Sequence, residues 1–221
     1  MCLDATDAVL DEAIELKVKF IITHHPFIFG GLSRITDSDN LGKKVIKAIK
    51  NGINIYSAHT NLDFCSGGIN EFLALTIGLK NLKPIDNYIS ENEGFGRIGE
   101  LEKATQIDDF VATISEKLND KNIRVVRGSS ATIKKVAVIN GSGGGDTTSI
   151  DKALANGCDC LVTSELKHHI ALYAKELGIT IIEPTHYTSE RVYLQAFVNT
   201  LKSKLVDIEV LLSSKETNPY N

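Results

Sequence analysis

The hydrophobic positions of this chain alternate between a helical period and a strand-like period. Apolar residues recur at three- and four-residue spacings, as in amphipathic helices, in the segments 7–17, 40–50, 67–79, 107–118, 147–156, 166–177 and 189–204. Short runs rich in β-branched residues predict strands at 20–23, 53–58, 123–127, 135–140, 160–163, 179–183 and 208–211. This alternation is typical of βαβ units. We therefore predict an α/β fold with mixed, mainly parallel sheets flanked by helices.

Two parts of the chain resemble each other. Residues 11–23 align with residues 151–163 without a gap, from a shared Asp to a shared Thr. The match predicts one domain built from two similar βαβ-containing halves, 1–96 and 97–221. The alternative is that any two βαβ units share part of this pattern.

Two stretches show neither period. The polar stretch 81–96 contains Pro84 and two glycines, and we expect it to connect the halves. The segment 213–221 is polar at the end of the chain, and we expect it to be a disordered tail.

Composition narrows the function. The 221 residues carry a net charge of −4, and lysines and arginines cluster only in pairs, so nucleic acid is an unfavoured partner. No apolar stretch approaches the roughly 20 residues of a membrane helix, and no signal-peptide pattern opens the chain. We therefore expect a cytoplasmic protein with no membrane contact.

The first candidate for chemistry is the pair His24-His25, directly after the predicted strand 20–23. Adjacent side chains of an extended segment point in opposite directions, so the pair favours two neighbouring metal ions over a single one. Pro26 follows and favours a fixed turn. The alternative is a surface turn with two solvated imidazoles.

Two further predicted strands end in a similar way. His59 and Asp63 follow the strand 53–58, and His186 and Glu190 follow the strand 179–183. Parallel strands place their carboxyl ends at one edge of a sheet, so these side chains should meet there. Taken alone, Asp63 could instead close an Asx turn, and Glu190 could be a carboxylate favoured by a helix dipole.

The whole set contains three imidazoles and two carboxylates: His24, His25, Asp63, His186 and Glu190. Zinc accepts this mixture of ligands, and iron or manganese are alternatives. Two such ions close together activate water and stabilise an oxyanion, which favours hydrolysis. His59 and His169 are the candidates for proton transfer.

A glycine-rich segment follows the strand 135–140. Backbone N–H groups of Gly141, Ser142, Gly143 and Gly144 could hold an anion such as a phosphate. The segment lacks the spacing of a dinucleotide fingerprint and of a P-loop. A turn that needs several glycines explains it nearly as well.

Five motifs carry a resemblance to a known family: Ile22-Thr23-His24-His25-Pro26, Ala58-His59-Thr60-Asn61-Leu62-Asp63, Gly141-Ser142-Gly143-Gly144, Lys167-His168-His169 and His186-Tyr187-Thr188-Ser189-Glu190. Through them nearly the whole chain resembles the NIF-three-like dinuclear metal-centre family of GTP cyclohydrolase I type 2 homologues. The resemblance implies two divalent metal ions on the five ligands above, with His59 behind them. It also implies a homohexameric ring whose metal sites face an internal cavity, with GTP as a candidate substrate.

The chain departs from this family in three places. Relatives usually begin with a helical segment before the equivalent of Met1, and we expect this chain to lack it. Without that helix apolar sheet surface would be exposed, and at about 25 cal/mol per Å² a few hundred Å² is comparable with the net stability of a domain. Ser164 stands where relatives tend to have Gly, and the short link 81–96 leaves out the inserted domain of longer relatives.

Two functions follow as hypotheses. The first is a dinuclear metal hydrolase that acts on a nucleotide or another small phosphorylated or heterocyclic substrate. The second is a non-catalytic, metal-binding ring that serves as a regulatory scaffold for proteins or nucleic acid. Open coordination positions filled by water would favour the enzyme, and a closed shell of four ligands would favour the scaffold.

Overall fold

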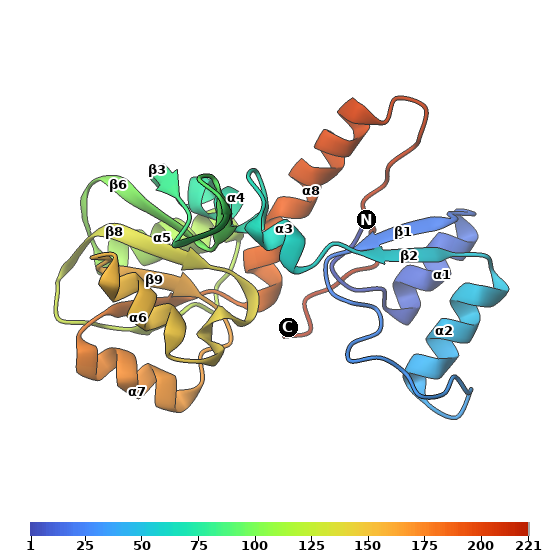
Figure 1. Cartoon of the computed structure of the whole chain (residues 1–221), viewed down its shortest axis with the longest axis horizontal. Coiled ribbons are helices and arrows are strands. Elements are labelled where there is room, and N and C mark those ends of the chain that lie inside the picture. Colours follow the sequence, from blue (N-terminus) through green and yellow to red (C-terminus); the bar gives the residue numbers. More distant parts are fainter. Residues whose placement is uncertain (221) are drawn as a thin grey trace. The chain divides into compact units, whose positions relative to one another are not determined.

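The computed structural model describes residues 1–220, apart from the side chains of 87–89, and divides into two compact units. Unit 1 comprises Met1–Leu62 and Leu194–Asn221, and unit 2 comprises Asp63–Tyr193. Figure 1 shows their helices and strands coloured along the chain. Among the described residues, no helix has the length and apolar character that crossing a membrane requires. The similarity of the two halves 1–96 and 97–221, which the sequence suggests, stays a prediction.

Unit 1 is built on two parallel strands with two helices beside them, as Figure 1 shows. The elements are α1 (Asp7–Glu15), β1 (Phe20–Thr23), α2 (Asn40–Lys50) and β2 (Asn54–Ser57). Their shared core consists of Cys2, Val9, Leu10, Ala13, Ile21, Ala48 and Ile53. Because β1 and β2 run parallel, their carboxyl ends lie at the same edge, and His24 and His59 follow there.

Both helices of unit 1 begin at a side chain that accepts a hydrogen bond from the first turn. Thr6 Oγ1 accepts from the Val9 amide at 3.3 Å, and Asp39 Oδ1 accepts from the Gly42 amide at 2.7 Å. These caps satisfy amide groups that have no partner within the helix. They explain why the predicted and observed starts of α1 and α2 coincide.

The described carboxyl-terminal residues of unit 1 contain no strand, so the strand predicted at 208–211 is wrong. The segment meets the amino terminus through single hydrogen bonds. The Met1 amino group donates to the Leu211 carbonyl at 2.8 Å, and the Ser213 amide donates to the Met1 carbonyl at 2.9 Å. Two isolated bonds do not make the continuous ladder that defines a strand.

The segment expected to be a disordered tail, 213–221, makes further hydrogen bonds with the amino-terminal residues. Glu216 Oε1 accepts from the amides of Leu3 and Asp4, and Ser214 donates to Glu12. Residue 221 of that tail lies outside the described residues. These bonds tie the segment that carries Asp4 to the carboxyl-terminal part of unit 1.

Unit 2 contains a six-stranded mixed sheet among its described residues, in the order β3-β6-β8-β9-β10-β7. The strands are β3 (Lys80–Lys83), β6 (Arg97–Gln106), β7 (Arg124–Val126), β8 (Thr132–Ile139), β9 (Cys160–Thr163) and β10 (Thr180–Glu183). The central strands β8, β9 and β10 are parallel, and the outer pairs are antiparallel. The predicted α/β class with a mixed, partly parallel sheet is confirmed.

The predicted link 81–96 is more ordered than expected. It overlaps β3 and contains a hairpin of β4 (Asp86–Ser90) and β5 (Glu93–Phe95). These strands are short and largely polar, so they lack the apolar alternation from which a strand is predicted. The stretch therefore contains strands that the sequence pattern did not predict.

Helices cover both faces of the large sheet. They are α4 (Ile69–Thr76), α5 (Ile107–Leu118), α6 (Thr148–Ala155), α7 (His168–Leu177) and the first part of α8 (His186–Lys204), whose residues from Leu194 on belong to unit 1. The short α3 (Thr60–Phe64) also crosses the boundary between the units, and a 3-10 turn spans Gly141–Gly145. Alternate residues of β8 belong to different cores: Val136 and Val138 pack with α4 and α5, and Ala137 and Ile139 pack with α6 and α7. The parallel strands thus lie in a buried sheet between two helical layers.

Candidate metal centre

Three histidines gather at the carboxyl edge of the unit 1 sheet. The ring centroids of His24 and His25 are 5.1 Å apart, and His59 lies 5.4 Å from His24 and 6.1 Å from His25. His24 is buried, whereas His25 and His59 are partly exposed. The predicted ligand pair and the predicted proton-transfer residue His59 therefore occupy one place in this unit.

The side chains of His24 and His25 do not diverge as an extended segment predicts. One ligand nitrogen of each lies within 4.8 Å of one of the other. The strand ends at Thr23, whose hydroxyl donates to the His25 carbonyl at 2.7 Å and bends the chain. One nitrogen of each ring could therefore face the same ion, and the number of ions stays a prediction.

Each ring of this pair has its Nδ1 atom next to an oxygen. His24 Nδ1 lies 2.8 Å from the Ala58 carbonyl, and His25 Nδ1 lies 3.0 Å from Asp4 Oδ1. Histidines that bind metals usually donate their other ring N–H to a carbonyl or a carboxylate. The two rings of unit 1 have this arrangement, with Nε2 as the nitrogen that would ligate an ion.

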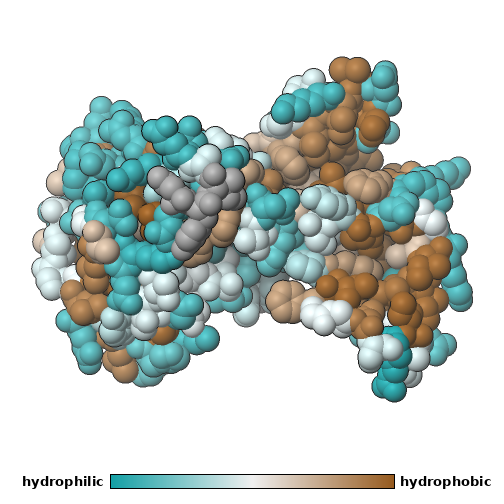
Figure 2. All heavy atoms as spheres, in the orientation of Figure 1, coloured by the Kyte–Doolittle hydropathy of each residue, from teal (hydrophilic) through white to brown (hydrophobic). Residues whose placement is uncertain are grey.

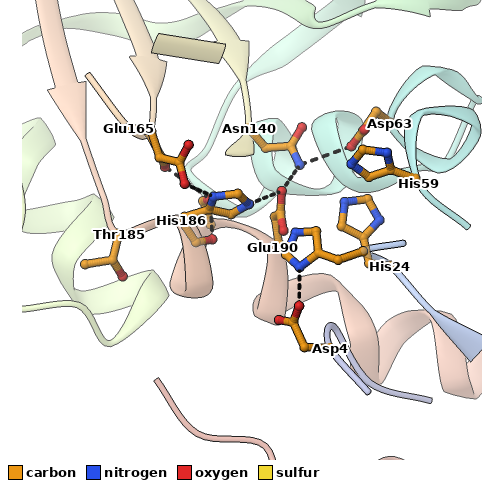
Figure 3. Close-up of polar contacts among 12 residues, drawn as sticks. Asp4, His24, His59, Asp63, Asn140, Glu165, Thr185, His186 and Glu190 are labelled. Carbon is orange, nitrogen blue, oxygen red and sulfur yellow. Dashed lines mark hydrogen bonds and ion pairs between the residues drawn. The ribbon is translucent and has the colours of Figure 1, made fainter. Parts of the chain in front are cut away.

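Three predicted ligands of unit 2 belong to one hydrogen-bonded network, drawn in Figure 3. The Asn140 side-chain amide donates to Asp63 Oδ1 and to Glu190 Oε1, both at 3.1 Å. His186 Nε2 lies 3.0 Å from Glu190 Oε1, and His186 Nδ1 lies 2.7 Å from Glu165 Oε1. Two carboxylates and an imidazole thus converge around one asparagine.

The sheet explains this convergence. Asn140 directly follows β8, Glu165 follows β9, and His186 follows β10, so all three lie beyond the carboxyl ends of adjacent parallel strands. Glu165 has a left-handed backbone, with φ of 56°. Such a conformation is costly for a residue other than glycine, and it is found most often at functional sites.

Helix α8 begins three residues earlier than predicted, at His186 rather than Ser189. Asp120 provides the reason, because its carboxylate accepts from the Thr185 amide at 2.7 Å and from the Thr188 hydroxyl. An acceptor at this point satisfies the first turn of the helix. His186 and Glu190 consequently lie one turn apart on the same helical face.

The environment of His186 changes its pKa. Burial favours the neutral ring, but the hydrogen bonds and negative charges of Glu190 and Glu165 outweigh burial and raise the pKa of His186 to about 9. A divalent ion on this ring would replace the proton. Metal binding here would therefore weaken as the pH falls.

The glycine-rich segment lines the same network. Gly141 has φ of 58°, and a side-chain carbon at this position would lie 2.4 Å from Glu190 Oε1 and 3.2 Å from His186 Nε2. The Gly144 amide donates to the Ser164 carbonyl at 3.0 Å, and the Gly143 amide to the Asn140 carbonyl at 3.4 Å. The close approach to the candidate ligands explains why position 141 has no side chain. An anion site on the backbone of 141–144 stays a prediction.

The other predicted site residue, His169, lies in the first turn of α7 with an exposed side chain. Asn70 also belongs to the group in unit 2, since its side-chain amide donates to the Asp63 carbonyl at 3.2 Å and its Oδ1 accepts from the Asn140 amide at 2.8 Å. Four residues of the two groups were not predicted as site residues: Asp4, Asn70, Asn140 and Glu165. Asn140 and Glu165 follow predicted strand ends, and that signal could have found them. Asp4 and Asn70 act through contacts distant in sequence, for which the pattern gives no signal.

Fold and side chains together define an α/β protein in which each unit collects candidate metal ligands at the end of parallel strands. The chain belongs to the DUF34/NIF3 (NGG1p interacting factor 3) family, whose model matches residues 1–219. The family resemblance inferred from the motifs is thereby confirmed.

Relatives cover the chain throughout. A GTP cyclohydrolase 1 type 2 homolog of Clostridium perfringens is 35% identical and covers 100% of this chain and 84% of its own length. The protein NIF3 homolog of Schizosaccharomyces pombe is 33% identical and covers 99% and 82%. Among solved structures, a Bacillus cereus protein related to NIF3 matches with a TM-score of 0.92 at 25% identity, covering 100% of this chain and 87% of that one.

Proposed function

We propose that this protein binds two divalent metal ions through His24, His25, Asp63, His186 and Glu190, with zinc as the first choice and iron or manganese as alternatives. The observation that carries the proposal is the pairing of three histidine Nδ1 atoms with oxygens: Ala58 carbonyl, Asp4 Oδ1 and Glu165 Oε1. This arrangement orients imidazoles toward a metal and raises their basicity. Asp63 and Glu190, which share Asn140, supply the carboxylates.

We propose further that the centre hydrolyses a nucleotide or another small phosphorylated or heterocyclic substrate. Divalent ions at such a site supply Lewis acidity and a water nucleophile at neutral pH. His59 and His169 are the proposed proton-transfer groups, and the backbone at 141–144 is the proposed phosphate contact. The name GTP cyclohydrolase 1 type 2 homolog, borne by the Clostridium perfringens relative, makes GTP the first substrate to test.

The proposed setting is cytoplasmic, in a homohexameric ring without membrane or nucleic-acid contact. The negative net charge supports the absence of nucleic acid, since phosphate backbones bind through lysine and arginine. The ring rests on the family resemblance alone. Its test is the mass of the purified protein in solution.

The decisive experiment measures metal content and hydrolysis together. The purified protein should hold close to two divalent ions per chain, and His25→Ala with Asp63→Ala should remove them. His168→Ala, an exposed residue of α7, is the matched control and should keep both ions. A wild-type protein without stoichiometric metal, or a double variant that retains it, contradicts the metal centre. Metal without turnover in a nucleotide screen contradicts only the hydrolase.

A second function has one observation in its favour. A relative from Saccharomyces cerevisiae, 31% identical over 99% of this chain, is named NGG1-interacting factor 3. We propose as the alternative a non-catalytic, metal-binding scaffold that serves protein or nucleic-acid interactions. A closed shell of four protein ligands, read by X-ray absorption, would favour the scaffold, and water in the shell would favour the hydrolase.

A further inference from the structure

Arg97 is a buried positive charge beside the segment that carries Asp63. The residue opens β6 and is only 1% exposed. Its Nε donates to Glu71 Oε2 of α4 at 3.2 Å, which pairs the charge. Burying a guanidinium costs several kcal/mol unless its remaining N–H groups also find acceptors.

Backbone carbonyls from two separate segments provide those acceptors. Nη1 donates to the Gly94 carbonyl in β5 at 3.1 Å and to the Gly96 carbonyl directly after β5 at 2.8 Å. Nη2 donates to Cys65 at 2.8 Å and to Phe64 at 3.4 Å. The Asn92 carbonyl also lies within 3.4 Å. The five N–H groups of the guanidinium therefore all have acceptors in the described part of the chain.

Phe64 and Cys65 directly follow Asp63, so Arg97 fixes the backbone that leads away from this candidate ligand. Asn70 fixes the ligand's own backbone, since its amide donates to the Asp63 carbonyl at 3.2 Å. Asn140 fixes the Asp63 carboxylate, as described above. Three side chains thus restrain one residue, and of these three it is Asn140 that contacts the carboxylate.

We propose that Arg97 is a positioning residue that holds the Asp63 segment in the geometry needed to bind metal, and that it does so by clamping this segment to the β4–β5 hairpin. The proposal rests on the proposed metal centre. A planar guanidinium with five fixed donors can serve both segments, whereas a lysine ammonium with three donors at one point cannot.

The test compares Arg97→Lys with wild type in a Zn²⁺ competition assay against a chromophoric chelator. We expect Arg97→Lys to weaken Zn²⁺ binding about 10- to 100-fold, the usual effect of losing a group that supports a ligand. The matched control is Leu75→Ala, an exposed side chain of α4, which leaves every contact of Arg97 in place and should weaken binding by no more than about threefold.

A double-mutant cycle separates positioning from general structural support. If Arg97 acts through Asp63, Arg97→Lys added to Asp63→Asn should change the Zn²⁺ affinity by no more than about threefold. An equal loss in both backgrounds, or no loss in either, overturns the proposal.

A second measurement tests the clamp without requiring bound metal. Amide exchange in peptides covering 63–68 should rise at least tenfold in Arg97→Lys, while exchange in α5 stays unchanged. If wild type takes up no Zn²⁺, the metal centre fails, but this measurement still decides whether Arg97 holds the segment. Unchanged exchange in 63–68 overturns the clamp.

Arg97→Met with Glu71→Leu replaces the ion pair by apolar groups, and it is the second variant if Arg97→Lys does not fold. The same exchange pattern is expected from it. If neither variant folds, native-state exchange of wild type decides the question. The amides of Gly68 and Ile85, on the two clamped segments, should then open with the same dependence on urea. Two separate openings overturn the proposal.

Discussion

The two units hold their candidate ligands in different ways. In unit 1 a two-stranded sheet presents three histidines, held by one backbone carbonyl and by Asp4. In unit 2 a six-stranded sheet presents two carboxylates and one histidine, held by Asn140, Asn70, Glu165 and the Asp120 contact to the start of α8. The network of unit 2 is the more extensive, so its ligands should be the less sensitive to loss of one neighbour.

The surfaces of the units differ as well. All the exposed large hydrophobic side chains of the described residues belong to unit 1, apart from Leu75, Leu172 and Leu177. Figure 2 shows brown surface over α1, α2 and the far end of α8, whereas the surface over β6 and α6 is mainly teal. A small sheet has less interior in which to bury apolar groups. Unit 1 therefore leaves more of its large apolar side chains at the surface than unit 2 does.

Truncation of a core side chain in unit 2 should have the largest effect on stability. Phe110, 1% exposed in the core of unit 2, packs under the sheet, and Phe110→Ala should lower the free energy of unfolding by about 3–5 kcal/mol. Leu172→Ala, on the surface of α7, is the control and should change it by less than about 0.5 kcal/mol. Urea unfolding followed by circular dichroism measures both. Similar values for the two variants would contradict a tightly packed core in unit 2.

Removal of the carboxylates behind the histidines compares the two ligand groups directly. Asp4→Ala in unit 1 and Glu165→Ala in unit 2 should each weaken Zn²⁺ binding, within the 10- to 100-fold range of such losses. We expect Asp4→Ala to have the greater effect, because His186 keeps Glu190 as a second partner. Competition against a chelator measures both affinities. A greater loss in Glu165→Ala would reverse the comparison.

Local patterns predicted much of the fold. The periods at 20–23, 40–50, 107–118 and 160–163 coincide with β1, α2, α5 and β9 residue for residue. α2 begins at the side-chain cap of Asp39, α5 ends at the left-handed Asn119, and the two strands are short runs rich in apolar residues. The missed strands β3, β4 and β5 are short and polar, and their pairing is decided by neighbours in space.

Some features of the candidate site could also be predicted from local sequence, and others could not. Its ligand types at strand ends could be predicted, because parallel strands place their carboxyl ends together. The start of α8 could not, since Asp120 lies 65 residues before the amide it accepts from. His24 and His25 are also placed by residues distant in sequence, since the His24 amide donates to the Cys2 carbonyl at 3.1 Å and the His25 amide to the Leu3 carbonyl at 2.9 Å. Such contacts are tertiary and leave no period in the sequence.

The backbone at Gly141 in unit 2 lies very close to the candidate ligand Glu190, and a substitution of Gly141 tests this close approach. Gly141→Ala should lower the free energy of unfolding by about 1–2 kcal/mol, because φ of 58° is unfavourable for alanine. The new methyl group should also displace Glu190. Gly145→Ala is the control, since its side-chain carbon would meet no atom within 4 Å. Thermal unfolding measures both, and equal melting temperatures for the two variants would contradict the crowding.

The smallest effect concerns pH and the start of α8. Burial raises the pKa of Asp120, but hydrogen bonds from Thr188, Thr185 and Asn122 outweigh burial and lower it below its ordinary value of 3.8. A carboxylate whose folded pKa is lowered adds stability above its unfolded pKa, and this stability is lost as the pH falls through the folded pKa. Asp120→Asn should therefore cost about 0.5–1 kcal/mol at pH 7 and progressively less below pH 3.8.

Urea unfolding of wild type and Asp120→Asn at pH 7 and near pH 2.5 measures this difference. Glu176→Gln, an exposed carboxylate of α7, is the control and should behave like wild type at both values. A gap between wild type and Asp120→Asn that stays constant with pH would mean that the ionised carboxylate does not fix the start of α8. The helix would then begin at His186 for local reasons, and the ligands of unit 2 would depend on the sheet and Asn140 alone.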